Sequence, residues 1–246
     1  ANRTILSGDL NGDDEPGFEN NDDNSYHVFY HPEGTDLDST AILDGFTISG
    51  GNANGAFPHD HGGGMVNLHG SFPMLTNCTF SANSAEYGGG MVNSNGSSPT
   101  LINCTFSTNS AGQIGSGMYN YESSPILTDC TFSANSAAFT GGGICNYSSS
   151  PELTNCTFES NSAVYGGGIY NNHSSPELTN CTFAGNSASV SGGGMLNHSW
   201  SSPVLTNCTF ADNSAAEQGG GMYNIDSSSP ALANCTLEAN SAVTGG

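Results

Sequence analysis

The sequence predicts an all-β fold, a right-handed parallel β-helix in which a three-strand solenoid makes about seven coils of 25–27 residues. A Gly triplet, first found at Gly62–Gly64, recurs along the chain, and a Cys-Thr-Phe segment that first starts at Cys78 recurs with the same spacing. Two independent markers with one period indicate a repeat architecture, and a period of this length is typical of solenoids. Only 35% of the residues are hydrophobic and 34 are Gly, which suits the narrow interior of a stack.

Each coil is expected to hold three short strands that end in asparagine. In the coil of residues 151–171, alternation places Cys156 and Phe158 inside and Thr157 outside. No window has the 3.6-residue periodicity of an amphipathic helix, and a β-propeller blade needs roughly 40 residues. Asparagine tolerates left-handed backbone, so we expect it at the corners, where its amide can bond to the coil above. In this coil the corner residues are Asn155, Asn161 and Asn171.

The Cys-Thr-Phe segments place one cysteine in each coil, pointing inward. Neighbouring Cβ atoms would lie about 4.8 Å apart, which is longer than a relaxed disulfide prefers. We therefore expect buried free thiols that serve as small apolar fillers. Cys145 belongs to an outward row instead and is the one thiol expected to react. The predicted structural ladder is Cys78, Cys104, Cys130, Cys156, Cys181, Cys208 and Cys235.

The outward positions of the Gly-triplet strands form a second row of interest. If exposed, such an apolar stripe would mark an interface, although simple stacking of like residues along a sheet explains it equally well. The predicted interface residues are Val66, Val92, Tyr119, Cys145, Tyr170, Leu196 and Tyr223.

Charge and composition restrict the partners. The chain has 22 acidic residues and one basic residue, Arg3, which gives a formal net charge of −21. Nucleic acid and anionic membrane surfaces are therefore poor partners. No stretch approaches the roughly 20 apolar residues of a membrane helix, so we expect no membrane insertion. We divide the chain into residues 1–35, an N-terminal capping or docking segment with an acidic loop, and residues 36–246, the β-helix repeats.

The acidic loop carries the best single motif for a metal. Asp9, Asn11 and Asp13 alternate as the first three ligands of a calcium loop do, and predict a possible calcium site. Asp14 displaces the expected glycine and Asn20 stands where a glutamate would close the site. A solvated acidic turn is the alternative.

Histidines offer a second candidate at His59-Asp60-His61. A His-x-His pair can direct two imidazoles toward a transition metal, but a polar loop before the first Gly triplet is the simpler interpretation.

The repeats resemble a known family. Gly-Gly-Gly-[Met/Ile]-x-Asn segments and Phe-x-x-Asn pairs over residues 36–246 are similar to the repeats of chlamydial polymorphic outer membrane proteins and of secreted bacterial pectate-lyase-like surface proteins. The resemblance implies a right-handed β-helix that is exported and often adhesive. The Phe-x-x-Asn pairs are Phe80 to Asn83, Phe106 to Asn109, Phe132 to Asn135, Phe158 to Asn161, Phe183 to Asn186 and Phe210 to Asn213.

These observations favour an extracellular structural protein over an enzyme. We expect a fibre subunit at the cell surface that self-associates head to tail, with Thr4–Leu6 and His27–Tyr30 as docking strands. The alternative is an adhesin that binds a glycan or a receptor, for which Trp200, the single Trp, is the candidate contact. A polysaccharide-active enzyme is less favoured, because polyuronate lyases rely on Arg or Lys and the acids of the coils are scattered.

Overall fold

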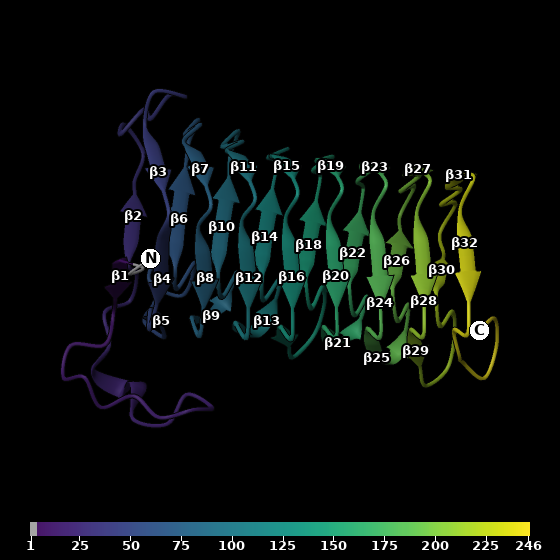
Figure 1. Ribbon diagram of the computed structural model, residues 1–246, viewed down its shortest axis with the longest axis horizontal. Helices are drawn as coiled ribbons and strands as arrows, with labels where there is room; N and C mark the ends of the chain where they lie inside the picture. The colour runs from purple at the N-terminus through teal and green to yellow at the C-terminus, as the bar shows by residue number, and fades with distance from the viewer. Residues whose placement is uncertain (1–3) are drawn as a thin grey trace.

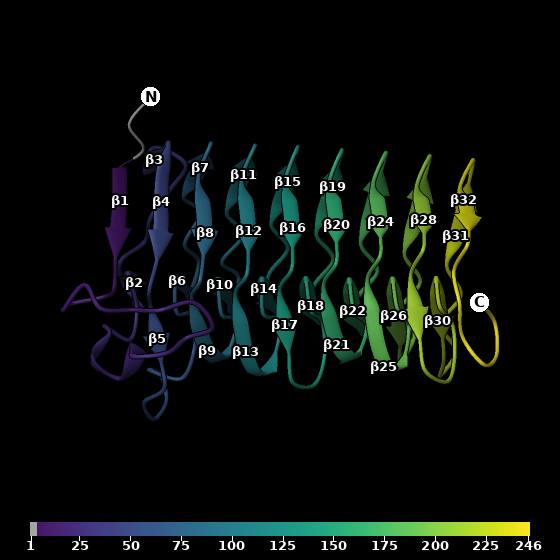
Figure 2. The same cartoon turned by 60° about the horizontal axis from the view of Figure 1, so that its bottom comes forward.

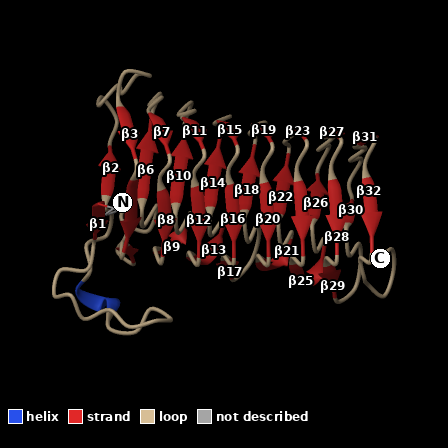
Figure 3. Cartoon of the chain, in the orientation of Figure 1, coloured by secondary structure: helices blue, strands red, loops and turns tan. Residues whose placement is uncertain are grey.

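The computed structural model describes residues 4–246 and is a straight rod of stacked parallel strands (Figure 1). Successive coils lie side by side along the rod axis, as a second view confirms (Figure 2). Within residues 4–246 the only helical element is the 3₁₀ turn η1 (Asn21–Asp23), which lies outside the stack (Figure 3). None of the helical structure in that range has the length and apolarity that a membrane crossing needs.

The strands form four sheets, so the prediction of three strands per coil is wrong by one strand. Sheet A contains the Cys-Thr-Phe segments. Its strands, in spatial order, are β1 (Thr4–Ser7), β4 (Phe46–Ser49), β8 (Thr79–Ser81), β12 (Thr105–Ser107), β16 (Thr131–Ser133), β20 (Thr157–Glu159), β24 (Thr182–Ala184), β28 (Thr209–Ala211) and β32 (Thr236–Glu238).

Sheet B contains the segments that follow the Gly triplets, and sheet C the segments that follow the prolines. Sheet B holds β2 (Phe29–His31), β6 (Met65–Leu68), β10 (Met91–Ser94), β14 (Met118–Tyr121), β18 (Ile144–Tyr147), β22 (Ile169–Asn172), β26 (Met195–His198) and β30 (Met222–Asn224). Sheet C holds β3 (Ile42–Asp44), β7 (Met74–Thr76), β11 (Thr100–Ile102), β15 (Ile126–Thr128), β19 (Glu152–Thr154), β23 (Glu177–Thr179), β27 (Val204–Thr206) and β31 (Ala231–Ala233).

Sheet D is the one that the sequence pattern did not predict. Its strands follow the second asparagine of each coil with Ser-Ala, and only the alanine points inward, so the apolar signal is too weak to distinguish a strand from a loop. The strands are β5 (Asn52–Ala53), β9 (Ser84–Tyr87), β13 (Ser110–Ile114), β17 (Ser136–Ala137), β21 (Ser162–Tyr165), β25 (Ser187–Ser191) and β29 (Ser214–Ala215).

Equivalent residues of successive coils face one another. Phe106 pairs with Phe132, and Leu127 with Leu153, in parallel register. Six phenylalanines of sheet A, one per coil from Phe80 to Phe210, therefore form a continuous buried column in which consecutive ring centroids lie 4.4–5.1 Å apart. All are fully buried, and the leucines of sheet C and the inward residues of sheet B pack around them.

Buried asparagines join the coils beside this column. The side-chain amide of Asn161 donates to the carbonyl of Phe132 and to Oδ1 of Asn186, both at 2.9 Å. The same pattern repeats one coil earlier from Asn135 to Asn161. A second buried asparagine ladder runs through sheet B, from Asn67 to Asn224. Each interior amide is thus satisfied by a neighbouring coil.

The corner prediction holds for only one of the three asparagines. Asn155 has the left-handed backbone, with φ of 55°, and is exposed. Asn161 and Asn171 are buried, and the left-handed residues beside them are Ser160 and His173. The amides of the buried pair serve the ladders, so the turn falls on a neighbour whose side chain can point to solvent.

Candidate functional site

The outward side of sheet B carries the row of residues that the sequence predicted as an interface. The stripe predicted there is not uniformly exposed. Val66, Val92, Cys145 and Leu196 are buried, and Tyr119, Tyr170 and Tyr223 are half-buried. The expectation of a continuous exposed stripe is therefore wrong at four of its seven positions.

The Gly triplets explain this burial. Gly88 has a φ of 65°, and a Cβ placed on it would collide with the side chain of Val92. The turn before each strand of sheet B thus folds back over the outward residue of that strand, and only a residue without a side chain permits the approach.

Cys145 shows the chemical consequence. Its thiol is 1% exposed and lies 3.7 Å from Oγ1 of Thr140. Burial raises the pKa of Cys145 to about 12. The prediction of a reactive thiol at this position is therefore wrong, because the thiolate that would react is disfavoured.

Aromatic rings at the far end of the same strands remain accessible. We call Tyr121, Tyr147, His173 and Trp200 the aromatic row. Their consecutive ring centroids lie 6.0, 6.5 and 5.6 Å apart, with one ring from each successive coil. Trp200 is 67% exposed and Tyr147 is 40% exposed. The strands that carry or precede these rings, β14, β18, β22 and β26, are neighbours in Figure 1.

Hydrogen bonds hold His173 of the row and the neighbouring His198 in place. The amide of Asn172 lies 3.1 Å from Nδ1 of His198, and its Oδ1 lies 2.5 Å from Nδ1 of His173. Nε2 of His198 lies 2.9 Å from a carboxylate oxygen of Asp226. Because a carboxylate only accepts and the NH₂ of Asn172 donates, His198 carries its proton on Nε2 in this network.

Two clefts flank the row on this face. One, of about 280 Å³, is lined by Phe57, Val92, Tyr119 and Tyr121. The other, of about 390 Å³, is lined by residues that include Tyr170, His198 and Tyr223.

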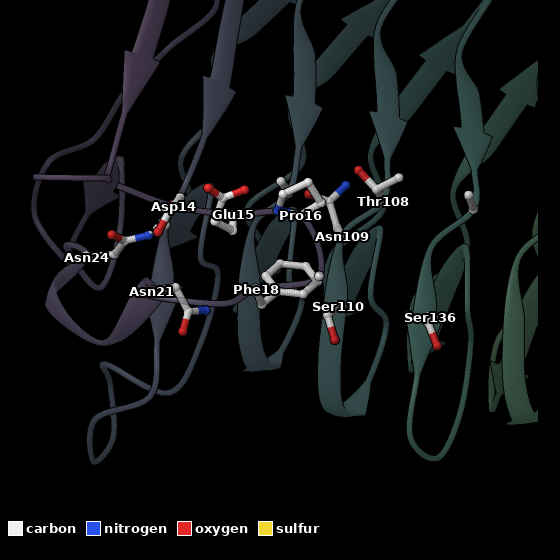
Figure 4. Close-up of a pocket in the computed structure, with 14 residues that line it drawn as sticks. Asp14, Glu15, Pro16, Phe18, Asn21, Asn24, Thr108, Asn109, Ser110 and Ser136 are labelled. Carbon is white, nitrogen blue, oxygen red and sulfur yellow. Dashed lines mark hydrogen bonds between the residues drawn. The ribbon is translucent and has the colours of Figure 1, made fainter. Parts of the chain in front are cut away.

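The N-terminal loop of residues 8–25 forms a larger cleft of about 460 Å³ against the corners of the coils (Figure 4). Glu15, Pro16 and Phe18 of the loop line one side, and Thr108 and Ser110 are among the residues of the other side. Its lining is mostly exposed loop and turn, without a network like that of the aromatic row.

The predicted calcium ligands lie in this loop. A carboxylate oxygen of Asp9 accepts hydrogen bonds from the backbone N–H groups of Gly12 and Asp13, at 2.6 and 3.3 Å. Asn11 and Asp13 are exposed. In the part of the chain that the structure describes, no three His, Cys, Asp or Glu side chains come together in a metal-binding group. The loop thus has the form of an acidic turn closed by Asp9.

The two histidines of His59-Asp60-His61 separate. Nδ1 of His59 lies 3.0 Å from Nε2 of His27, whereas Nδ1 of His61 contacts the carboxylate of Asp60 at 2.6 Å. Nδ1 of His27 lies 3.0 Å from the carbonyl of Gly62, so it must donate there. Burial lowers the pKa of His27. Sequence reasoning missed this pair because its members are 32 positions apart.

The cysteine row lies where the sequence placed it, on the inner side at the start of sheet A. No member is paired in a disulfide; six are buried and Cys235 is partly exposed. The thiols donate to carbonyl groups, as Cys156 does to Leu127 and Thr154 at 3.7 and 3.5 Å. These contacts give the sulfur atoms a structural rather than a reactive environment.

Comparison with known proteins yields one match. The family described as right handed beta helix region matches residues 36–187, more than half of the chain. No curated protein and no solved structure matches significantly.

Proposed function

Because the chain belongs to the right-handed β-helix family, we propose that it is an extracellular structural protein, a rigid rod that serves as the subunit of a surface fibre. The observation that carries this proposal is that successive coils repeat the same structure along the rod axis. Phenylalanine, leucine and asparagine occupy the same register in coil after coil. A net charge of −21 favours contact with water and dissolved cations and disfavours binding to nucleic acid.

Assembly head to tail is the form of association that the strand edges support. In the last coil, Leu232 is 43% exposed and Leu237 is 47% exposed, although their equivalents Leu205 and Phe210 are fully buried. At the opposite edge, β1, β2 and β3 each pair on one side within the described structure. Parallel edges of this kind are complementary, so a second copy would continue the same ladders in a heterologous, open contact.

Sedimentation and negative-stain microscopy of the polypeptide of residues 1–246 test this assembly. We expect species that lengthen with concentration, and we expect Leu237→Asp to shorten them. Thr236→Asp is the matched control, because Thr236 points outward in the same strand. A monodisperse particle of about the 25.1 kDa chain mass at every concentration would contradict the proposal.

A glycan-binding adhesin is the second candidate, and the aromatic row favours it. Exposed aromatic rings beside hydrogen-bonded polar groups suit the recognition of sugars. A glycan-array signal that Trp200→Ala abolishes would favour this function over the fibre.

Calcium binding at Asp9, Asn11 and Asp13 remains part of the proposal as a stabilising element of the N-terminal loop. An enzyme is not proposed. Arg3, the only Lys or Arg of the chain, lies outside the described residues, so residues 4–246 contain no permanently charged cation to hold an acidic substrate.

A further inference from the structure

We propose that the aromatic row binds a single uncharged glycan chain laid along the rod axis, so that successive sugar units contact Tyr121, Tyr147, His173 and Trp200. The inference rests on the adhesin candidate above and gives it a site, a ligand class and a direction.

The direction follows from the spacing of the rings. Each ring comes from a different coil, and neighbouring strands of a sheet are roughly 4.8 Å apart. The centroid distances of 5.6–6.5 Å reflect that repeat plus a small lateral step. A ligand across the rod would meet one ring, whereas a chain along the rod meets all four. Aromatic faces pack against the apolar C–H face of a sugar ring.

Polar groups beside the rings are already fixed. Asn172 is 9% exposed and bridges His173 and His198, which in turn contacts the exposed carboxylate of Asp226. This network holds the rings of His173 and His198 in place beside the row, and a pre-organised site loses less entropy on binding. The cleft that contains Tyr121 extends beyond the first ring of the row, and the cleft that contains His198 runs beside the later rings, so a ligand has space along the row.

Charge decides the class of glycan. The chain carries 22 acidic residues, and its single Lys or Arg is Arg3, before the first strand. Asp226 and Glu122 lie in the turns that follow β30 and β14, in the same region as the row. Uronates and sulfated sugars would meet uncompensated negative charge here, so the row suits a neutral polymer.

The chain contains its own probe, because Trp200 is the only tryptophan. Its fluorescence is titrated with cellohexaose, laminarihexaose, mannohexaose, xylohexaose and chitohexaose, and with hexagalacturonate as the charged comparison. We expect at least one neutral hexaose to shift the emission and hexagalacturonate to leave it unchanged. The corresponding disaccharide should bind at least about tenfold more weakly, because it covers fewer rings.

Variants locate the binding. Tyr147→Ala should weaken the effective hexaose by about tenfold, and Tyr147→Phe should preserve binding because it retains the ring. Val204→Ala is the control, since Val204 is an exposed apolar residue that follows Trp200 in the chain but lies on sheet C. Circular dichroism and sedimentation of each variant report folding and assembly separately.

The proposal is overturned if no neutral hexaose shifts the Trp200 emission, if disaccharide and hexaose bind equally, or if folded Tyr147→Ala binds as the parent does. A glycan-array signal that survives Tyr147→Ala would retain the adhesin candidate and remove the aromatic row from it. If the unmodified chain forms no fibres at any concentration but still shows the fluorescence response to a neutral hexaose, the fibre proposal is contradicted and the aromatic row is retained.

Discussion

The N-terminal loop of residues 8–25 and the coil of residues 151–171 maintain their shapes by different means. In the loop, the Asp9 carboxylate accepts local backbone N–H groups and most side chains are exposed. In the coil, Phe158 is fully buried and stacks on a phenylalanine on each side. Every strand of the coil also pairs with equivalents above and below.

This difference shows where the stability of a solenoid resides. The coil depends on contacts that neighbouring repeats supply, whereas the loop depends largely on hydrogen bonds between its own residues, as from Gly12 to Asp9 and from Asn24 to Asp14. A matched substitution should therefore cost more in the coil than in the loop, and paired variants measure by how much.

The largest contrast is expected for phenylalanine. Phe158→Ala should lower the free energy of unfolding by about 3–5 kcal/mol, because it removes a ring from a stacked, fully buried column. Phe18→Ala, at a half-buried position of the loop, should cost less than about 1 kcal/mol. Urea unfolding followed by circular dichroism measures both. Equal losses would contradict the assignment of stability to the column.

Asparagine gives the next contrast. Asn161→Ala should cost about 2–3 kcal/mol, because it removes the buried hydrogen bonds of the Asn161 side chain to the carbonyl of Phe132 and from the backbone and side-chain N–H groups of Asn135. Asn20→Ala removes only one exposed hydrogen bond, to the carbonyl of Asp13, and should change stability by less than about 0.5 kcal/mol. If Asn161→Ala unfolds at the urea concentration of the parent, the ladder is not an important source of stability.

Glycine tests the turns. Gly166 has a φ of 67°, and a Cβ there would lie 2.6 Å from the carbonyl oxygen of Ile169, so Gly166→Ala should cost about 2 kcal/mol. Gly17 also has a positive φ, of 90°, but no heavy atom lies within 4 Å of its Cβ position. Gly17→Ala should cost about 1 kcal/mol, from backbone strain alone. Thermal melts of the two variants separate strain from collision, and a Gly17 variant less stable than the Gly166 variant would reverse the interpretation.

Calcium should act on the loop alone. At tenfold excess over Kd, bound calcium would add about 1.4 kcal/mol to the stability of the loop. We expect chelation to increase hydrogen exchange in residues 8–25 and not in residues 151–171, and Asp9→Ala to remove this response. If hydrogen exchange in residues 8–25 does not change with calcium, the calcium proposal is contradicted and the loop is an acidic turn without a bound ion.

The smallest effect is a pH dependence near the loop. Burial holds the pKa of His27 below the value of about 6.5 that is usual for a histidine. The folded segment therefore favours neutral His27, so its contribution to stability is complete above pH 6.5 and is lost as the pH falls through the folded pKa. Hydrogen exchange of residues 26–31, corrected for intrinsic rates, should rise between pH 7 and pH 5. Residues 157–159 serve as the internal control, and His27→Gln should remove the change.

The inward rows of the coils were predictable from sequence. The strands of sheet D, the burial of outward residues and the contacts between side chains of different coils were harder to predict. Cysteine, phenylalanine and leucine recur with one spacing, and that spacing directly reports which positions stack. The strands of sheet D escaped prediction because one inward alanine, such as Ala163, gives little apolar contrast. The burial of Val92 was missed because it depends on the path of a glycine turn over the strand. Two further features join residues from different coils: the contact of His27 with His59, and the aromatic row. No local sequence pattern predicts either of them.

The unequal coil lengths have a consequence for how such a rod changes over generations. Extra residues fall in the turns, as at Ser199 and Trp200, which both have left-handed backbone, while the strands keep their register. Duplication or loss of a DNA segment that encodes one whole coil would therefore alter the length of the rod without altering its cross-section. Unequal recombination between near-identical repeats supplies such changes readily, so length is a heritable variable that selection can tune separately from the chemistry of the surface.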